Sequence, residues 1–168
     1  MPVIPDRPML FLDVDGTLIP FAARPDGPAR QARGGSAAVE VGNPMLDRLN
    51  LEDGPRLLAL GCDLVWATSW MAEANEVVSP WIGLPELPVM DWPDDDDQPV
   101  EGIHWKTRAL VERAAGRTFV WVDDEITGLD REWIAEHHRG RALAHRVDPR
   151  VGLTHVDFQT IRHWLAAA

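Results

Sequence analysis

The sequence contains one cysteine, Cys62, among its 168 residues, and it contains no tyrosine. A single thiol excludes a disulfide framework and a metal site built from several thiolates. No apolar run approaches the roughly 20 residues that a membrane-spanning helix needs. Residues Met1–Pro8 lack the basic start and the apolar stretch of a signal peptide. We therefore expect a soluble, cytoplasmic protein.

Basic residues are also scarce, because 16 Lys and Arg stand against 27 Asp and Glu and give a net charge of −11. This balance disfavours general nucleic-acid binding, which depends on neutralising phosphates with Lys and Arg. It leaves room for a local basic site, and a bound divalent cation would offset part of the charge. Eight tryptophans are present, and we interpret most of them as core and pocket-wall residues.

The length and the composition, 45% apolar and 26% charged, are typical of one globular domain spanning residues 1–168. Short apolar runs alternate with segments of helical pattern, which predicts an α/β fold of three layers, a parallel sheet with helices on both faces. We expect strands near residues 9–14, 63–67, 118–122 and 142–147, with a short one at 87–90. We expect helices near residues 52–60, 71–78, 104–115, 130–138 and 155–167.

A flap is expected at about residues 18–50. Residues 20–38 are rich in Pro, Gly, Ala and Arg and are predicted to be irregular, whereas Val39–Val41 alternates like one strand of a hairpin. Its return strand is expected near Met45–Leu49. The intervals that flank the second strand are too short for a large cap domain, so an exposed site that admits bulky phosphorylated substrates is expected, unless a second subunit closes it.

Small polar or acidic residues follow three of the predicted strands, at Asp13-Val14-Asp15-Gly16-Thr17, Thr68-Ser69 and Asp123-Asp124. In open parallel sheets, ligands gather at the carboxyl ends of the strands, so these residues are expected to converge. Four carboxylates near one another would repel strongly without a positive group. A hard divalent cation with oxygen ligands resolves that repulsion, and we expect it to be Mg²⁺.

The spacing of the first acidic pair adds detail. Asp13 and Asp15 are two residues apart, so both side chains point the same way from an extended strand, and Gly16 permits a tight turn and a close approach of backbone to ligand. One carboxylate held ionised and one free to carry a proton can act as nucleophile and acid. A solvated turn is the alternative for an isolated Asp-x-Asp-Gly, but Asp13 follows an apolar run, where an uncompensated charge is costly.

These motifs, with Lys106 between the second and the last, resemble the four ordered motifs of the haloacid dehalogenase-like (HAD) superfamily. Three segments resemble, more narrowly, a bacterial group of small HAD domains related to the HAD domain of "Swiss Army Knife" RNA repair proteins. They are Trp66–Trp70, Trp121–Glu125 and Arg146–Thr154. The resemblance spans most of the chain and implies a Rossmann-like sheet whose central strand is at residues 9–14.

The resemblance also implies roles for individual residues. Asp13 would be the nucleophile that forms an aspartyl-phosphate, and Asp15 would be the acid and then the base. Thr68, helped by Ser69, would bind the phosphoryl oxygens, and Lys106 would counter their charge. Gly16 and Trp70 are further candidates for substrate contact. Mg²⁺ would be held by Asp13, the backbone carbonyl of Asp15, Asp123 and Asp124.

Each of these residues also has an ordinary structural alternative. Lys106 fits a solvent-facing helix position, Thr68 fits a helix cap, and Trp70 fits core packing. Asp123 and Asp124 fit a helix-capping acid with a solvated neighbour. Three other charged segments have less certain roles in the sequence. We interpret the acidic run Asp94–Asp97 as a solvated loop, and the basic residues Arg24, Arg30 and Arg33 as either a basic loop or a contact for an anionic substrate. Arg146 and Arg150 would either bind a substrate phosphate or pair with Asp148.

We therefore expect a Mg²⁺-dependent phosphomonoester hydrolase, a HAD-type phosphatase with a minimal cap. One alternative is a nucleic-acid (RNA or DNA) end phosphatase, which the resemblance favours and the net charge of −11 opposes. The other is a catalytically idle domain that binds phosphorylated ligands or protein partners, which the complete acidic motifs oppose. Neither a particular substrate nor an oligomeric state follows from the sequence.

Overall fold

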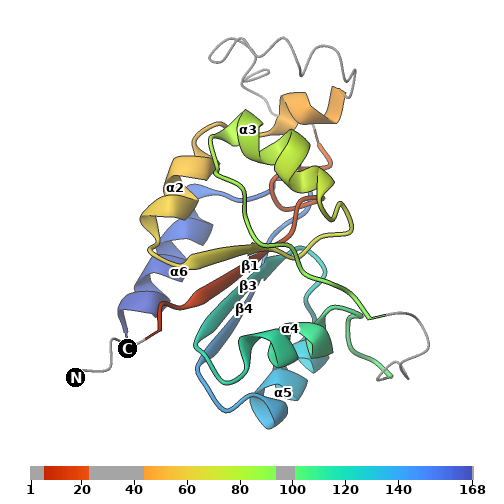
Figure 1. Cartoon of the computed structure of the whole chain (residues 1–168), viewed down its shortest axis with the longest axis vertical. Helices are drawn as coiled ribbons and strands as arrows, with labels where there is room; N and C mark the ends of the chain where they lie inside the picture. Colours follow the sequence, from red (N-terminus) through yellow and green to blue (C-terminus); the bar gives the residue numbers. More distant parts are fainter. Residues whose placement is uncertain (1–5, 23–43, 94–100, 168) are drawn as a thin grey trace.

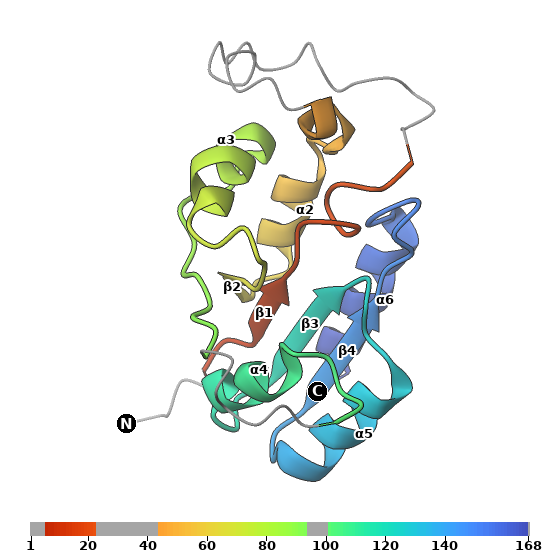
Figure 2. The ribbon, with the colours of Figure 1, turned by 90° about the vertical axis from the view of Figure 1, so that its right-hand side faces the viewer.

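In the computed structural model, the described residues are 6–22, 44–93 and 101–167. They contain four parallel strands in one sheet, in the spatial order β2-β1-β3-β4. The strands are β1 (Met9–Leu12), β2 (Asp63–Trp66), β3 (Phe119–Asp123) and β4 (Ala142–Arg146). Figure 2 shows them side by side, with their carboxyl ends at the same edge of the sheet.

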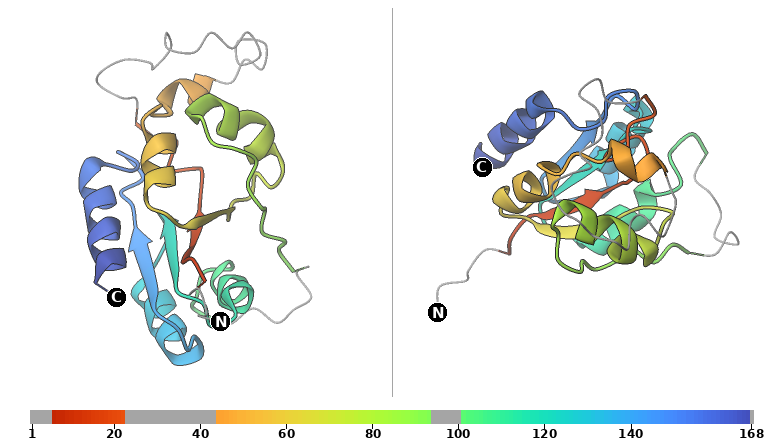
Figure 3. Two further views of the ribbon diagram at one scale, coloured as in Figure 1. Left: turned by 60° about the vertical axis from the view of Figure 1, so that its left-hand side comes forward. Right: turned by 90° about the horizontal axis from the view of Figure 1, so that it is seen from above.

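Helices cover both faces of this sheet. Figure 1 shows α2 (Asp53–Ala59) and α6 (His155–Ala166) on one face, and α4 (Thr107–Ala114) and α5 (Gly128–His137) on the other. Figure 3 shows α6 running alongside the strands. Three shorter elements complete the order: η1 (Pro44–Arg48), a 3₁₀ helix; η2 (Ala74–Val78), a π-helix; and α3 (Ser79–Ile82). The predicted α/β, three-layer, Rossmann-like fold is confirmed.

The apolar strands form where they do because both faces of the sheet are buried. Successive side chains alternate between the faces, so Leu10 and Leu12 join the core beneath α2 and α6, whereas Met9 and Phe11 join the core beneath α4 and α5. All four residues of β1 are buried. A polar residue inside β1 would lie in one of the two cores, so the first polar residues come only after Leu12, where the strand ends.

The central position of β1 aligns the residues that follow the strands. Leu12 is in register with Trp66 on one side and with Val122 on the other. Backbone hydrogen bonds extend this alignment by one residue, from Asp13 N to Val122 O at 3.1 Å and from Ala67 N to Leu12 O at 2.8 Å. The three motifs that follow β1, β2 and β3 therefore leave the sheet at one level.

Two predicted elements differ in the structure. The helix expected to end before Ser79-Pro80 continues as α3 to Ile82, because Pro80 lies in the first turn of α3, where its missing N–H is not needed. The strand expected at 87–90 is reduced to a single bridge between Trp66 and Val89.

The predicted flap lies largely outside the described residues, which omit 23–43, including Val39–Val41. The prediction of a return strand near Met45–Leu49 is wrong, because Pro44–Arg48 forms the 3₁₀ helix η1. Among the described residues, no helix has the length and apolar character needed to cross a membrane.

Candidate active site

Three buried carboxylates meet at the carboxyl end of the sheet. Asp13 follows β1, Asp123 ends β3 and Asp124 comes next, and one oxygen of each lies within 4.8 Å of the others. The amino group of Lys106 lies among them, with Nζ 3.0 Å from Asp13 Oδ1 and 2.7 Å from Asp123 Oδ2. Lys106 itself is buried, so the sequence-level alternative of a solvent-facing helix residue is wrong.

The charges of this cluster are not balanced by its own residues. With all three carboxylates ionised, the single ammonium would leave two negative charges in a buried place. Burial, together with the charge of Asp123, raises the pKa of Asp13 to about 8, although Lys106 opposes the shift. Burial and Asp123 likewise raise the pKa of Asp124 to about 6. Burial alone would lower the pKa of Lys106, but Asp13 and Asp123 outweigh it and raise it, so the ammonium stays charged.

The donor set therefore fits a hard divalent cation. Its ligand atoms would be carboxylate oxygens, which Mg²⁺ prefers, and the two negative charges left uncompensated when all three carboxylates are ionised would balance the charge of the ion. The oxygens come from a strand end and from the following loop, and both are fixed by the sheet. Asp13, Asp123 and Asp124 are the residues that would hold it. The side chain of Asp15 is not in this group among the described residues.

Gly16 lies directly against one of these carboxylates. Its φ is +76°, a left-handed conformation that side-chain-bearing residues avoid. A Cβ built on Gly16 would lie 2.6 Å from Cγ of Asp124. The glycine that the sequence placed at a tight turn thus also leaves the space that the Asp124 carboxylate fills.

Asp15 faces solvent, unlike Asp13. Its Oδ2 accepts a hydrogen bond of 2.9 Å from the indole Nε1 of Trp70. Trp70 was expected to line a pocket or to pack in the core. Its half-buried ring packs against the core on the α2 and α6 side, and its indole N–H also contacts the second acid of the first motif. A carboxylic group fixed by one oxygen and open to water on the other side is suited to carry a proton.

Thr68 follows β2, is buried, and lies two residues before Trp70 in the chain. Its Oγ1 accepts a hydrogen bond from the backbone N of Trp70 at 3.2 Å, but the expected helix cap is wrong, because residues 69–72 form a turn and the next helix, η2, begins at Ala74 with Glu73 as its N-cap. Its backbone oxygen accepts a hydrogen bond of 3.3 Å from Trp92 Nε1. Ser69 is exposed at the same edge.

The segment that carries Lys106 is fixed by a residue that the sequence interpretation missed, Asp130. Its buried carboxylate accepts hydrogen bonds from the backbone N of His104 and from Thr107 Oγ1, both at 2.7 Å, and from the N and Oγ1 of Thr127, both at 2.8 Å. These bonds outweigh the effect of burial and lower the pKa of Asp130. The available signal was Thr127-x-x-Asp130, the pattern of a helix-capping box.

His104 and Glu125 form a second link across the site. His104 Nε2 lies 2.9 Å from Glu125 Oε2, and His104 Nδ1 accepts a hydrogen bond from the backbone N of Lys106 at 3.2 Å. The backbone N of Glu125 donates to Asp123 Oδ1 at 3.0 Å. Asp123 is therefore held by Lys106 on one oxygen and by the following backbone on the other, rather than serving as a simple helix cap.

A basic pocket adjoins the acidic cluster at the end of β4. Arg146 is in register with Asp123, and its Nε donates to the backbone oxygen of Asp124 at 3.1 Å. Arg146 and Arg150 line a pocket of about 430 Å³ together with Val147, Asp148 and Pro149. Asp148 accepts a hydrogen bond from the backbone N of Arg150. No ion pair links either arginine side chain to a carboxylate within the described ranges.

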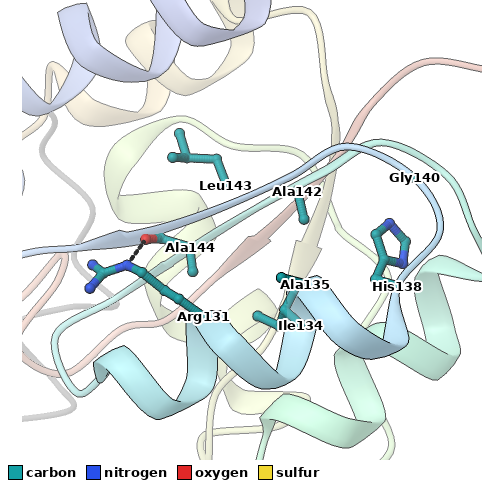
Figure 4. Close-up of a pocket in the computed structure, with 8 residues that line it drawn as sticks. All are labelled: Arg131, Ile134, Ala135, His138, Gly140, Ala142, Leu143 and Ala144. Carbon is teal, nitrogen blue, oxygen red and sulfur yellow. Dashed lines mark hydrogen bonds between the residues drawn. The ribbon is translucent and has the colours of Figure 1, made fainter.

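A second cavity, of about 340 Å³, lies between α5 and β4 and is shown in Figure 4. Its two charged or titratable side chains are already bonded. Arg131 Nε donates to Ala144 O at 3.1 Å, and His138 Nε2 lies 3.0 Å from Arg117 O. None of the acidic site residues lines this cavity, so it is distinct from the site at the end of the sheet.

Two groups of candidate residues from the sequence lie outside the described part of the chain. They are the acidic run Asp94–Asp97 and the basic residues Arg24, Arg30 and Arg33. The residues that the structure does bring together are those of the four ordered motifs. They are Asp13, Asp15, Gly16, Thr68, Lys106, Asp123 and Asp124.

Comparisons with known proteins agree with this arrangement. The sequence model of the family described as "HAD domain in Swiss Army Knife RNA repair proteins" matches residues 9–158, which include every motif named above. Searches among curated proteins and among solved structures found no match. The family is one of phosphatase-type hydrolases in general terms. The chain belongs to the HAD superfamily, in the family of HAD domains described from Swiss Army Knife RNA repair proteins.

Proposed function

We propose that the protein is a Mg²⁺-dependent phosphomonoester hydrolase that works through an aspartyl-phosphate on Asp13. The observation that supports this most is the contrast between two acids of one strand end. Asp13 is buried and lies 3.0 Å from the ammonium of Lys106, whereas Asp15 is exposed and hydrogen-bonded by Trp70. A fixed nucleophile and an accessible proton carrier are what two-step phosphoryl transfer needs.

In the first step, a carboxylate oxygen of Asp13 attacks phosphorus as the bond between phosphorus and the leaving oxygen breaks. Asp15 gives its proton to that leaving oxygen, so an alcohol departs. The hydrogen bond from Trp70 reaches Oδ2 of Asp15, and the proton is therefore carried on Oδ1. Lys106 and the hydroxyl of Thr68 offset the negative charge on the phosphoryl oxygens.

In the second step, water attacks the phosphorus of the aspartyl-phosphate. Asp15, now ionised, takes a proton from that water, and the bond between phosphorus and the Asp13 oxygen breaks. Inorganic phosphate is released, and both acids return to their starting protonation states. One residue thus serves as acid and then as base, which its exposed position permits.

The cation, when bound by Asp13, Asp123 and Asp124, neutralises charge on the phosphate and the carboxylates. The chain's own contribution is to keep these oxygens within 4.8 Å of one another before substrate arrives. Lys106 counters the repulsion between Asp13 and Asp123, because its ammonium is bonded to both carboxylates.

Hydrolysis of p-nitrophenyl phosphate with and without Mg²⁺ tests this function, with Asp13→Asn beside the native chain. Turnover that needs Mg²⁺ and is lost in Asp13→Asn is the expected result. Glu136→Gln, at an exposed carboxylate in the last turn of α5, is the control for the loss of one carboxylate. Turnover that survives in Asp13→Asn would assign the nucleophile to another residue. A folded chain that binds Mg²⁺ but hydrolyses none of a panel of phosphomonoesters would favour the idle binding domain instead.

A nucleic-acid end phosphatase is the second candidate, and the basic pocket favours it. A 5′- or 3′-phosphorylated strand carries a further phosphate near its end, and the pocket lined by Arg150 and by Arg146, which contacts Asp124, is placed to receive one. The net charge of −11 opposes binding of a long strand. Comparing kcat/KM for a mononucleotide and for a short oligonucleotide with the same terminal phosphate decides between the candidates. A preference for the oligonucleotide that weakens with added salt supports this one.

A further inference from the structure

We infer that Trp105 and Trp92 form a subsite beside the phosphoryl position that binds a planar aromatic ring of the leaving group. This inference rests on the proposed phosphomonoesterase function and adds the class of substrate. The two sources of such a ring are a nucleobase and a simple aryl group, and the experiment below separates them.

Trp105 is an unusual residue to find exposed. About 55% of its surface faces solvent, whereas the other seven tryptophans, all within the described residues, are buried or half-buried. It immediately precedes Lys106 in the chain, and Lys106 Nζ lies 5.4 Å from the centre of its ring. An exposed indole is therefore held within one side-chain length of the group that faces Asp13 and Asp123.

Trp92 connects the same place to the second motif. Its Nε1 donates to the backbone oxygen of Thr68 at 3.3 Å, so its indole is held beside a residue proposed to bind the phosphate. The rings of Trp92 and Trp105 meet edge to face, with their centres 4.8 Å apart and their planes 77° apart. The two indoles thus form one corner, fixed at one end to Thr68 and at the other to Lys106.

The orientation of Trp105 is fixed by further contacts. The ring of His104 lies 5.4 Å from it, centre to centre, and His104 is itself held by Glu125 at 2.9 Å. A ring that is held in place but exposed loses little freedom when a ligand stacks on it. Aromatic side chains bind bases and other planar rings through this kind of contact, with little dependence on the identity of the ring.

The chemistry of the site agrees with the position of this corner. A phosphoryl group held by Thr68 and Lys106 has its leaving oxygen directed away from Asp13, because nucleophile and leaving group lie in line. The leaving group therefore emerges on the solvent side, where Asp15 and Trp105 are exposed. A planar ring carried by the leaving group, through one methylene or through a ribose, therefore emerges on the side of the indole pair.

The test uses benzyl phosphate and cyclohexylmethyl phosphate, two primary-alcohol esters that differ in the planarity of the ring. The native chain is expected to have a kcat/KM about tenfold higher for the benzyl ester, the scale of one stacking contact. Trp105→Leu is expected to bring this ratio close to one. Trp133→Leu, a change at a half-buried indole on α5 that stacks on His137, is the matched control and should keep the native ratio.

A second arm separates the two ring sources. Adenosine 5′-monophosphate and ribose 5-phosphate share one leaving oxygen, so a higher kcat/KM for the nucleotide that falls in Trp105→Leu assigns a nucleobase. If kcat/KM is higher for the benzyl ester than for the cyclohexylmethyl ester, but equal for the nucleotide and ribose 5-phosphate, the subsite binds a simple aryl group. Equal kcat/KM within both pairs in the native chain, or a native ratio that survives in Trp105→Leu, overturns the inference.

Calorimetric binding makes the test independent of turnover. Benzylphosphonate and cyclohexylmethylphosphonate cannot be hydrolysed, and their affinities are measured with Mg²⁺ present for the native chain and for Trp105→Leu. A preference for the benzyl compound without any phosphatase activity would support the subsite and contradict the proposed function. Turnover of phosphomonoesters without any ring preference would support the function and contradict the subsite, as would equal or absent binding of the two phosphonates.

Discussion

Asp130 accepts a hydrogen bond of 2.7 Å from Thr107, the residue next to Lys106. The first turn of α5 is thereby tied to the start of α4, and the same carboxylate oxygen also holds the backbone N of His104. Asp130 touches no reacting group. It is a positioning residue, because it sets where the segment from His104 to Thr107 lies against the acidic cluster.

Replacing Asp130 with Asn is expected to cost about 3 kcal/mol of folding stability and to lower kcat. The backbone N–H groups of His104 and Thr127 bond opposite oxygens, and an amide offers only one acceptor. Urea unfolding measures the first effect, and p-nitrophenyl phosphate hydrolysis at a temperature where the variant is folded measures the second.

Asp157→Asn provides the control, since Asp157 forms the same capping box with Thr154 at the start of α6. It should reduce stability by about 1–2 kcal/mol and leave kcat unchanged. Equal losses of kcat in Asp157→Asn and Asp130→Asn would show that the effect on activity is a general loss of stability.

The free energy of unfolding should also depend on pH through the carboxyl group of Asp157. Burial alone would raise the pKa of this carboxyl, but the hydrogen bonds from His145 and Thr154 outweigh it and lower the pKa. A lowered folded-state pKa means that the stabilisation is present above the unfolded-state value, about 3.9, and is lost as pH falls through the folded-state value. The difference in unfolding free energy between the native chain and Asp157→Asn should therefore shrink from about pH 5 to about pH 2. A difference that stays constant over this range would contradict the assignment.

Gly16→Ala tests the contact with Asp124. The left-handed φ of +76° should cost about 1 kcal/mol, and the new methyl group should displace the Asp124 carboxylate and weaken Mg²⁺ binding. Gly61→Ala is the matched control, because Gly61 has a φ of +72° and no atom within 4 Å of its Cβ position. Both variants should lose stability, and only Gly16→Ala should lose the rise in melting temperature that Mg²⁺ gives the native chain. An unchanged Mg²⁺ response in Gly16→Ala would show that Asp124 is not needed for the metal.

Lys106→Met removes the only cation bonded to Asp13 and Asp123 among the described residues. Buried carboxylates without a partner are expected to cost about 3–5 kcal/mol in the absence of metal. Added Mg²⁺ should restore part of this loss, so that thermal unfolding shows a larger Mg²⁺ shift in the variant than in the native chain. A smaller shift than the native one would mean that Lys106 and the metal do not share the same carboxylates.

The strands and the acidic motifs were predictable because both depend on local sequence. β1 and β3 are continuous apolar runs, and the topology of a parallel sheet brings the residues after them together. The catalytic, substrate-binding and metal-binding roles of the site residues stay predictions, as does the single-domain division of the chain. The positions of Asp13, Lys106, Asp123 and Asp124 agree with those roles without testing them.

Other features could not be predicted, because they depend on contacts between distant segments. Nothing near Trp70 in the sequence indicates that its indole bonds Asp15, 55 residues away. The link from Asp130 to His104 likewise joins α5 to the segment that precedes α4 through one carboxylate. Pro80 was interpreted as a stop, although proline in the first turn of a helix is equally compatible with a new one.

The most direct test of the aspartyl-phosphate mechanism is the mass of the Asp15→Asn chain after brief mixing with p-nitrophenyl phosphate and Mg²⁺. p-Nitrophenolate leaves without a proton, so the first step should proceed, whereas the second step needs Asp15 as base and should stall. The account predicts a chain heavier by one phosphoryl group, with the addition on the peptide that contains Asp13, and no addition in the chain that also carries Asp13→Asn. Release of p-nitrophenolate by Asp15→Asn at the native steady rate with no covalent addition, or an addition on any other residue, would contradict it.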